Sequence, residues 1–119
     1  MREQRKNHRA DVFEDFAVID QATGDTLGTL RNISSGGMML LGPRTVKVDQ
    51  PYRLTVYLPK PISGISKLEL ATVCKWHTYD KEHMLHKAGF KFSTLTPRDE
   101  ELIVMLQTEY EFLATITER

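Results

Sequence analysis

Alternation of apolar and polar residues with a period of two is the feature that most constrains the fold of this chain. Successive side chains of a strand point to opposite faces, so alternation predicts strands with one buried face. The pattern is clearest in PYRLTVYLP, whose two faces carry Tyr52, Leu54, Val56 and Leu58 on one side and Arg53, Thr55 and Tyr57 on the other.

Five further runs of strand-forming residues are separated by turn-forming residues such as QATGD and NISSGG. They are DVFEDFAVID (11–20), TLGTLRNIS (26–34), GMMLL (37–41), KLELATVCKWHTY (67–79) and KAGFKF (87–92). In the long run 67–79, alternation predicts one core face made of Leu68, Leu70, Thr72, Cys74 and Trp76. In KAGFKF it predicts a core face of Ala88, Phe90 and Phe92, and the intervening DKEHMLH (80–86) is predicted to be a polar loop.

The period changes after residue 95, where Thr96 is a predicted N-cap, Pro97 the first helical residue, and Asp99 and Glu100 the acidic first turn. The helix is expected to run to about Ala114. Its apolar stripe, at spacings of three and four, is Leu102, Leu106, Tyr110 and Leu113. Six short strands and one helix predict a mainly β fold, a six-stranded antiparallel barrel with a C-terminal helix.

Size and charge favour one ordinary globular domain. The chain has 119 residues, 40% of them hydrophobic, and 16 Lys and Arg balance 16 Asp and Glu. Neither a secretory leader nor an apolar run of membrane-spanning length is visible, and there is one cysteine, so we expect a cytoplasmic protein that does not insert into membranes.

Catalytic and metal-binding patterns are not predicted. His83 and His86 are interpreted as solvated loop histidines because no third ligand stands at a typical spacing. Cys74 alternates into the core face and is interpreted as a small buried hydrophobic residue. No nucleophile or phosphate-binding motif is present, so an enzyme is not expected.

Two short segments remain, the basic start RKNHR (5–9) and the turn NISSGG (32–37). Each alone is typical of an ordinary solvated end or a tight turn. If strand 11–20 pairs with strand 26–34 through a turn at 21–25, however, Arg9 comes to lie beside the turn. Guanidinium groups pair with phosphate and stack on or hydrogen-bond guanine, so the combination predicts a small anionic purine ligand.

The ordered pair RxxxR (Arg5, Arg9) and [D/N]xSxxG (Asn32, Ser34, Gly37) resembles the signature of the PilZ domain family. CKW (74–76), AGFKF (88–92) and the closing helix stand where that family has similar features, so the resemblance covers essentially the whole chain. It implies a bacterial receptor for cyclic di-GMP, with an arm of residues 1–10 and a barrel domain of residues 11–119 whose helix spans about 97–114.

The resemblance further implies that Arg5 and Arg9 engage guanine and phosphate, while Asn32, Ser34 and Gly37 hold the other side of the ligand. Supporting contacts are expected from Gln4, Lys6, Ser35, Gly36 and Trp76. Many relatives have an arginine where this chain has Gln4, which leaves the number of bound ligand molecules open.

As a receptor without a further domain, the protein is expected to relay the signal to a protein partner that controls motility, exopolysaccharide or virulence. Two alternatives stay open: a small barrel that binds single-stranded nucleic acid, and a PilZ-like protein scaffold that ignores nucleotide. The neutral net charge and the aromatic residues interpreted as core, Tyr52, Trp76, Phe90 and Phe92, argue against nucleic acid.

Overall fold

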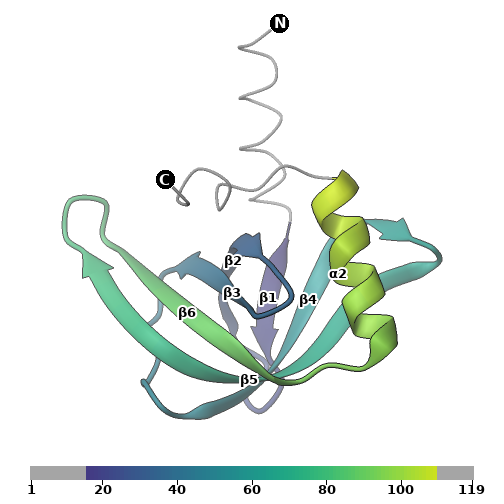
Figure 1. Cartoon of the computed structure of the whole chain (residues 1–119). Helices are drawn as coiled ribbons and strands as arrows, with labels where there is room; N and C mark the ends of the chain where they lie inside the picture. The colour runs from purple at the N-terminus through teal and green to yellow at the C-terminus, as the bar shows by residue number, and fades with distance from the viewer. Residues whose placement is uncertain (1–15, 110–119) are drawn as a thin grey trace, which may run out of the picture.

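The computed structural model describes residues 16–109, which form a closed barrel of six antiparallel strands followed by helix α2 (Figure 1). The strand order around the barrel is β1-β2-β3-β6-β5-β4. The elements are β1 (Ala17–Asp20), β2 (Thr26–Ile33), β3 (Gly37–Gly42), β4 (Pro51–Ile62), β5 (Ile65–Asp80), β6 (Leu85–Thr94) and α2 (Pro97–Glu109). The predicted fold class is confirmed.

The barrel interior is filled by the apolar faces that alternation predicts. Leu54, Val56 and Leu58 of β4 are buried, as are Leu68, Leu70 and Cys74 of β5 and Ala88, Phe90 and Phe92 of β6. Alternation predicts Thr55 on the outer face of β4, yet Thr55 is only 5% exposed. The reason is Gln21, which folds back from the β1–β2 turn and donates a hydrogen bond to Thr55 Oγ1 at 3.0 Å.

The β1–β2 hairpin forms as predicted, with its turn in residues 21–25. Ala17 pairs with Thr29, and the Leu30 N–H donates to the Phe16 carbonyl at 2.9 Å. Gly24 lies in the turn with φ of 80°, a conformation that glycine adopts without strain. Residues 11–15 of the predicted first strand lie outside the described residues.

A β-bulge in β5 makes one prediction wrong. Cys74 pairs with Phe90 but Trp76 pairs with Gly89, so β5 contains one more residue than β6 at this point. An extra residue reverses the face of every side chain that follows it. Trp76 therefore leaves the core face that it was predicted to share with Leu70 and Cys74, and its side chain is 41% exposed.

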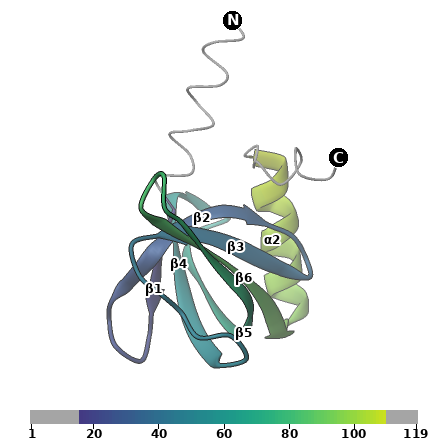
Figure 2. The same cartoon turned by 90° about the vertical axis from the view of Figure 1, so that its left-hand side faces the viewer.

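The helix begins with the predicted cap. The Asp99 N–H donates to Thr96 Oγ1 at 3.0 Å and the Thr96 N–H donates to Asp99 Oδ2 at 3.3 Å, a reciprocal capping arrangement. Leu102 and Leu106 are buried as predicted, and Ile103, which the predicted stripe omitted, is buried with them. Helix α2 stands along one side of the barrel (Figure 2). Tyr110, Leu113 and the predicted end at Ala114 lie outside the described residues.

The β5–β6 connection is shorter than the predicted loop 80–86. Strand β6 starts at Leu85, so His86 is a half-buried strand residue, and its interpretation as a solvated loop histidine is wrong. His83 is exposed in the turn, as predicted, with its Nδ1 2.8 Å from Asp80 Oδ2. No helix within residues 16–109 is long and apolar enough to cross a bilayer.

Candidate functional site

The turn between β2 and β3 is fixed by its own polar groups and by β6. The Ser34 N–H donates to the Gly37 carbonyl at 2.9 Å, and Ser34 Oγ accepts the Gly36 N–H at 3.3 Å. The Phe92 N–H donates to the Gly36 carbonyl at 3.1 Å. The serine of the NxSxxG motif therefore shapes the turn, and its hydroxyl keeps a hydrogen to donate.

Gly37 is required by a close backbone approach. It pairs with Lys91 of β6, and a Cβ at position 37 would lie 2.2 Å from the Phe90 carbonyl oxygen. Backbone atoms cannot swing away as a side chain can, so only glycine lets β3 and β6 come this close. The last residue of the motif is thus explained by the fold itself.

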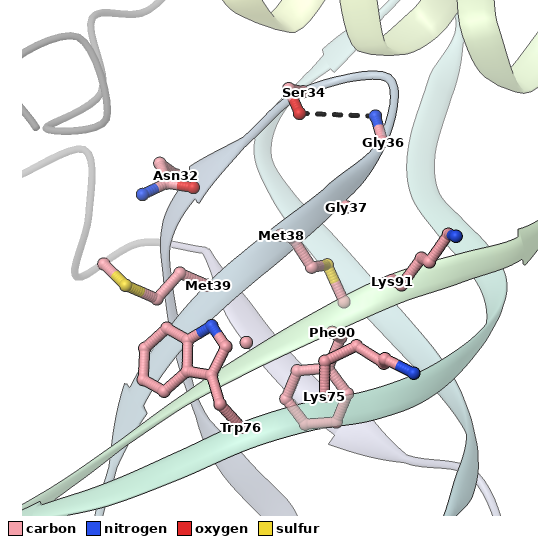
Figure 3. A pocket seen from close by; sticks show the side chains of 11 residues that line it. Asn32, Ser34, Gly36, Gly37, Met38, Met39, Lys75, Trp76, Phe90 and Lys91 are labelled. Carbon is pink, nitrogen blue, oxygen red and sulfur yellow. Dashed lines mark hydrogen bonds between the residues drawn. The ribbon is translucent and has the colours of Figure 1, made fainter. Parts of the chain in front are cut away.

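Beside this turn lies an open pocket of about 310 Å³ formed by the β2–β3 hairpin, β5 and β6 (Figure 3). Its lining residues are Asn32, Ser34, Gly36, Gly37, Met38, Met39, Lys75, Trp76, Gly89, Phe90 and Lys91. Residues that are far apart in the sequence meet here because β3 pairs with β6 and β6 pairs with β5. The pocket joins the predicted turn to the β5 bulge.

Trp76 crosses the backbone of Gly89. A Cβ on Gly89 would lie 2.1 Å from the indole Nε1 and 2.4 Å from Cε2, so the ring occupies the space that any other residue at position 89 would fill. The absence of a side chain at 89 thus lets the ring lie against β6. The half-exposed indole provides a flat apolar surface at the pocket, of the kind on which a nucleobase stacks.

The pocket lining carries two cations and no carboxylate. Lys75 and Lys91 are exposed, and neither Asp nor Glu is among the lining residues. Their ammonium groups favour an anionic ligand, and in this open setting they act as screened charges. Sequence reasoning missed both lysines as well as Gly89, because the bulge and the β3–β6 pairing that bring them to the pocket leave no local pattern.

Cys74 lies directly before the bulge and is fully buried. Burial raises the pKa of its thiol, and the Sγ–H donates to the Trp76 carbonyl at 3.4 Å. The prediction that Cys74 is a small buried residue of the core is confirmed. A neutral buried thiol is a poor nucleophile.

The predicted site residues thus divide into three groups. Asn32, Ser34, Gly36, Gly37 and Trp76 line the same pocket. Ser35 lies in the turn but is not among the lining residues. Arg5, Arg9, Gln4 and Lys6 lie outside the described residues.

Three comparisons relate the chain to known proteins. A family model described as "PilZ domain" matches residues 3–107. The comparison with curated proteins gives no match. Among solved structures, the "Structure of Bacillus subtilis Inhibitor of motility (MotI/DgrA)" is similar, with a TM-score of 0.63 and 17% sequence identity over 81% of this chain. The similarity covers 48% of that other chain, so this chain spans about half its length, and at this identity the likeness concerns the fold.

Proposed function

The chain belongs to the PilZ domain family, and from this premise we propose that it is a receptor for cyclic di-GMP rather than an enzyme. The observation that carries the proposal is the single pocket in which Asn32, Ser34, Gly37 and Trp76 meet two lysines. In the proposed complex, an arm formed by residues 1–10 supplies Arg5 and Arg9 and closes the ligand against this pocket.

The chemistry of the pocket matches the two parts of such a ligand. The Trp76 indole stacks on a guanine base, and the Asn32 amide exchanges hydrogen bonds with a base edge. Lys75 and Lys91 draw the phosphates, while the arginine forks of the arm pair with phosphate bidentately. Ser34 holds the turn and donates its remaining hydrogen to the ligand.

The strand pairing of the described chain is consistent with the proposed arm. Phe16 lies beside Leu30 of β2, two residues before Asn32. We therefore keep the division into an arm (1–10) and a barrel domain (11–119) as part of the proposal. In this proposal, contact between the arm and the bound ligand would present a new surface to a protein partner.

The proposed output is control of motility, exopolysaccharide or virulence through that partner. The solved structure of similar fold is described as an inhibitor of motility, which makes motility the first output to test. A pull-down with and without cyclic di-GMP identifies the partner.

Single-stranded nucleic acid is the competing ligand. Trp76 beside Lys75 and Lys91 favours it, since this tryptophan is exposed rather than part of the core. One aromatic residue and two lysines, however, are a platform for one base, whereas nucleic-acid grooves use several. Tight binding of an oligonucleotide that cyclic di-GMP does not displace would favour this alternative.

Titration calorimetry with cyclic di-GMP tests the proposal. The unchanged protein should bind, and Arg5→Ala or Arg9→Ala should each cost at least ~1.5 kcal/mol, about tenfold in affinity, for a lost charge-assisted contact. Arg53→Ala is the matched control, because Arg53 is an exposed arginine of β4 that does not line the pocket. Unchanged affinity in both arm variants would refute the arm model, and no binding at all would favour the protein scaffold.

A further inference from the structure

The β5–β6 hairpin carries a pair of histidines that the proposed function does not use. His77 of β5 is paired with Ala88 and His86 of β6 with Tyr79, so the two histidines are diagonal neighbours across the hairpin. Both are half-buried. The connected ends of β5 and β6 project from the rest of the barrel (Figure 1).

The two imidazoles meet through their ring nitrogens. His77 Nε2 lies 2.8 Å from His86 Nδ1, with an angle of 22° between the ring planes and 5.0 Å between the ring centres. The Tyr79 ring packs on His86 at 4.7 Å and limits the rotation of that imidazole. The arrangement is therefore held on both sides, by the strand pairing and by the tyrosine.

Either a hydrogen or a metal ion must lie between these nitrogens for the contact to be favourable. Each neutral imidazole has one N–H and one lone pair, so the contact needs a proton on one of the two nitrogens. When both rings carry their hydrogen on the outer nitrogen, two lone pairs converge on the same point. Converging imidazole lone pairs are the donor set that Zn²⁺, Ni²⁺ and Cu²⁺ prefer.

We propose that His77 and His86 form a binding site for a divalent transition metal ion. Zn–N bonds of about 2.0–2.1 Å place two nitrogens on one ion roughly 2.9–3.4 Å apart, so the pair has to open by only a few tenths of an ångström. The half-buried rings leave the other coordination positions to water. The proposal does not depend on cyclic di-GMP binding.

A neighbouring cluster is the rival location for a metal. In residues 16–109, the group of three ligand-type side chains within reach of one another is Asp80, Glu82 and His83. The Asp80 carboxylate is already engaged there: Oδ2 contacts His83 Nδ1, and Oδ1 accepts the N–H groups of Glu82 and His83. The hydrogen bond from His83 holds the pKa of Asp80 below its usual range. Since His83 belongs only to this cluster and His86 only to the histidine pair, substituting each in turn distinguishes the two locations.

The test is a calorimetric titration of the chelator-treated full chain with ZnCl₂ at pH 7.5. One Zn²⁺ should bind, and His77→Gln or His86→Gln should weaken binding at least about tenfold, because removing a ligand should cost no less than removing the hydrogen-bond partner of a ligand. The matched controls are His83→Gln and His8→Gln, which remove the other two of the four histidines and should leave the affinity unchanged. Lowering the pH to 6 should weaken binding, because protons compete for the same lone pairs.

Two further measurements keep the test independent of variant folding. Melting temperatures identify any variant that has lost its fold, and in the unchanged protein Zn²⁺ should shift the imidazole NMR signals of His77 and His86 before those of His83. Absence of Zn²⁺ binding up to millimolar concentration, loss of binding in His83→Gln, or selective shifts of His83 would each overturn the proposal.

Discussion

Replacing Gly89 by alanine tests whether the Trp76 platform depends on the missing side chain opposite it. The new methyl group would lie 2.1 Å from the indole Nε1. An ordinary contact of about 3.5–4.0 Å requires the ring to move by roughly 1.5 Å. Because an indole is the end of a rotatable side chain, we expect the ring to swing off β6 while the barrel stays intact.

The effects on stability and on binding should therefore separate. Alanine in a strand is better by ~0.5–1 kcal/mol than glycine, which offsets part of the lost Trp76 contact, so the free energy of unfolding should change by no more than about 1 kcal/mol. Base stacking on an aromatic side chain is worth about 1–3 kcal/mol, so cyclic di-GMP should bind roughly 5–150-fold more weakly.

The assay uses Trp76 itself, the one tryptophan of the chain. Its emission should shift to longer wavelength in Gly89→Ala as the ring becomes more exposed, and calorimetry measures the affinity. Trp76→Ala provides the control, because without the indole the methyl group at 89 meets no obstacle. The reasoning is refuted if Gly89→Ala binds as tightly as the unchanged protein, or if it costs as much affinity in the Trp76→Ala background as alone.

Two further predictions concern the barrel and its helix. Thr96→Ala removes the oxygen that accepts the Asp99 N–H and should lower the free energy of unfolding by about 1 kcal/mol in urea titrations. Thr96→Ser keeps a hydroxyl oxygen and should retain most of that free energy. Equal losses of stability in the two variants would exclude the cap as the cause. Burial raises the pKa of Cys74, so between the ordinary cysteine pKa and the raised one the folded chain keeps a proton that the unfolded chain releases. The contribution of Cys74 to the free energy of unfolding is therefore complete below the ordinary cysteine pKa and is lost as the pH rises above it. Urea titrations at pH 7 and 10 should show a smaller loss of stability between the two pH values in Cys74→Ala than in the unchanged protein. At pH 8, iodoacetamide should alkylate Cys74 at least about tenfold more slowly in the folded chain than in the chain unfolded by urea. Equal alkylation rates would contradict the burial argument.

Alternation predicted the parts of the fold that depend on one face of one strand. It identified the core residues of β4 and β6, and the turn residues identified the β1–β2 hairpin. The helix start was equally local, since Thr96 and Asp99 hydrogen-bond to each other within one turn. In each case the controlling interaction joins residues that are close in the sequence.

The failures have a different physical origin. Thr55 is buried by Gln21, 34 positions away, and His86 belongs to a strand because it pairs with Tyr79 across a tight turn. Lys91 reaches the pocket because β3 pairs with β6. Pairing partners of this kind are chosen by the closure of the barrel, and a local pattern carries little information about them.

Trp76 shows how the same departure from regularity both misleads the pattern and builds the site. One extra residue in β5 turns the indole out of the core, and Gly89 gives it a surface to lie on. Gly37 likewise permits the close approach that brings the NxSxxG turn onto β6. The pocket therefore lies where regular strand geometry is interrupted, and Trp76 is released from core packing there and left half-exposed. A prediction that assumes uninterrupted alternation is wrong for residues that follow a bulge, as it is for Trp76. A large aromatic residue that alternation assigns to the core, opposite a glycine of the neighbouring strand, is therefore a reason to look for a binding pocket.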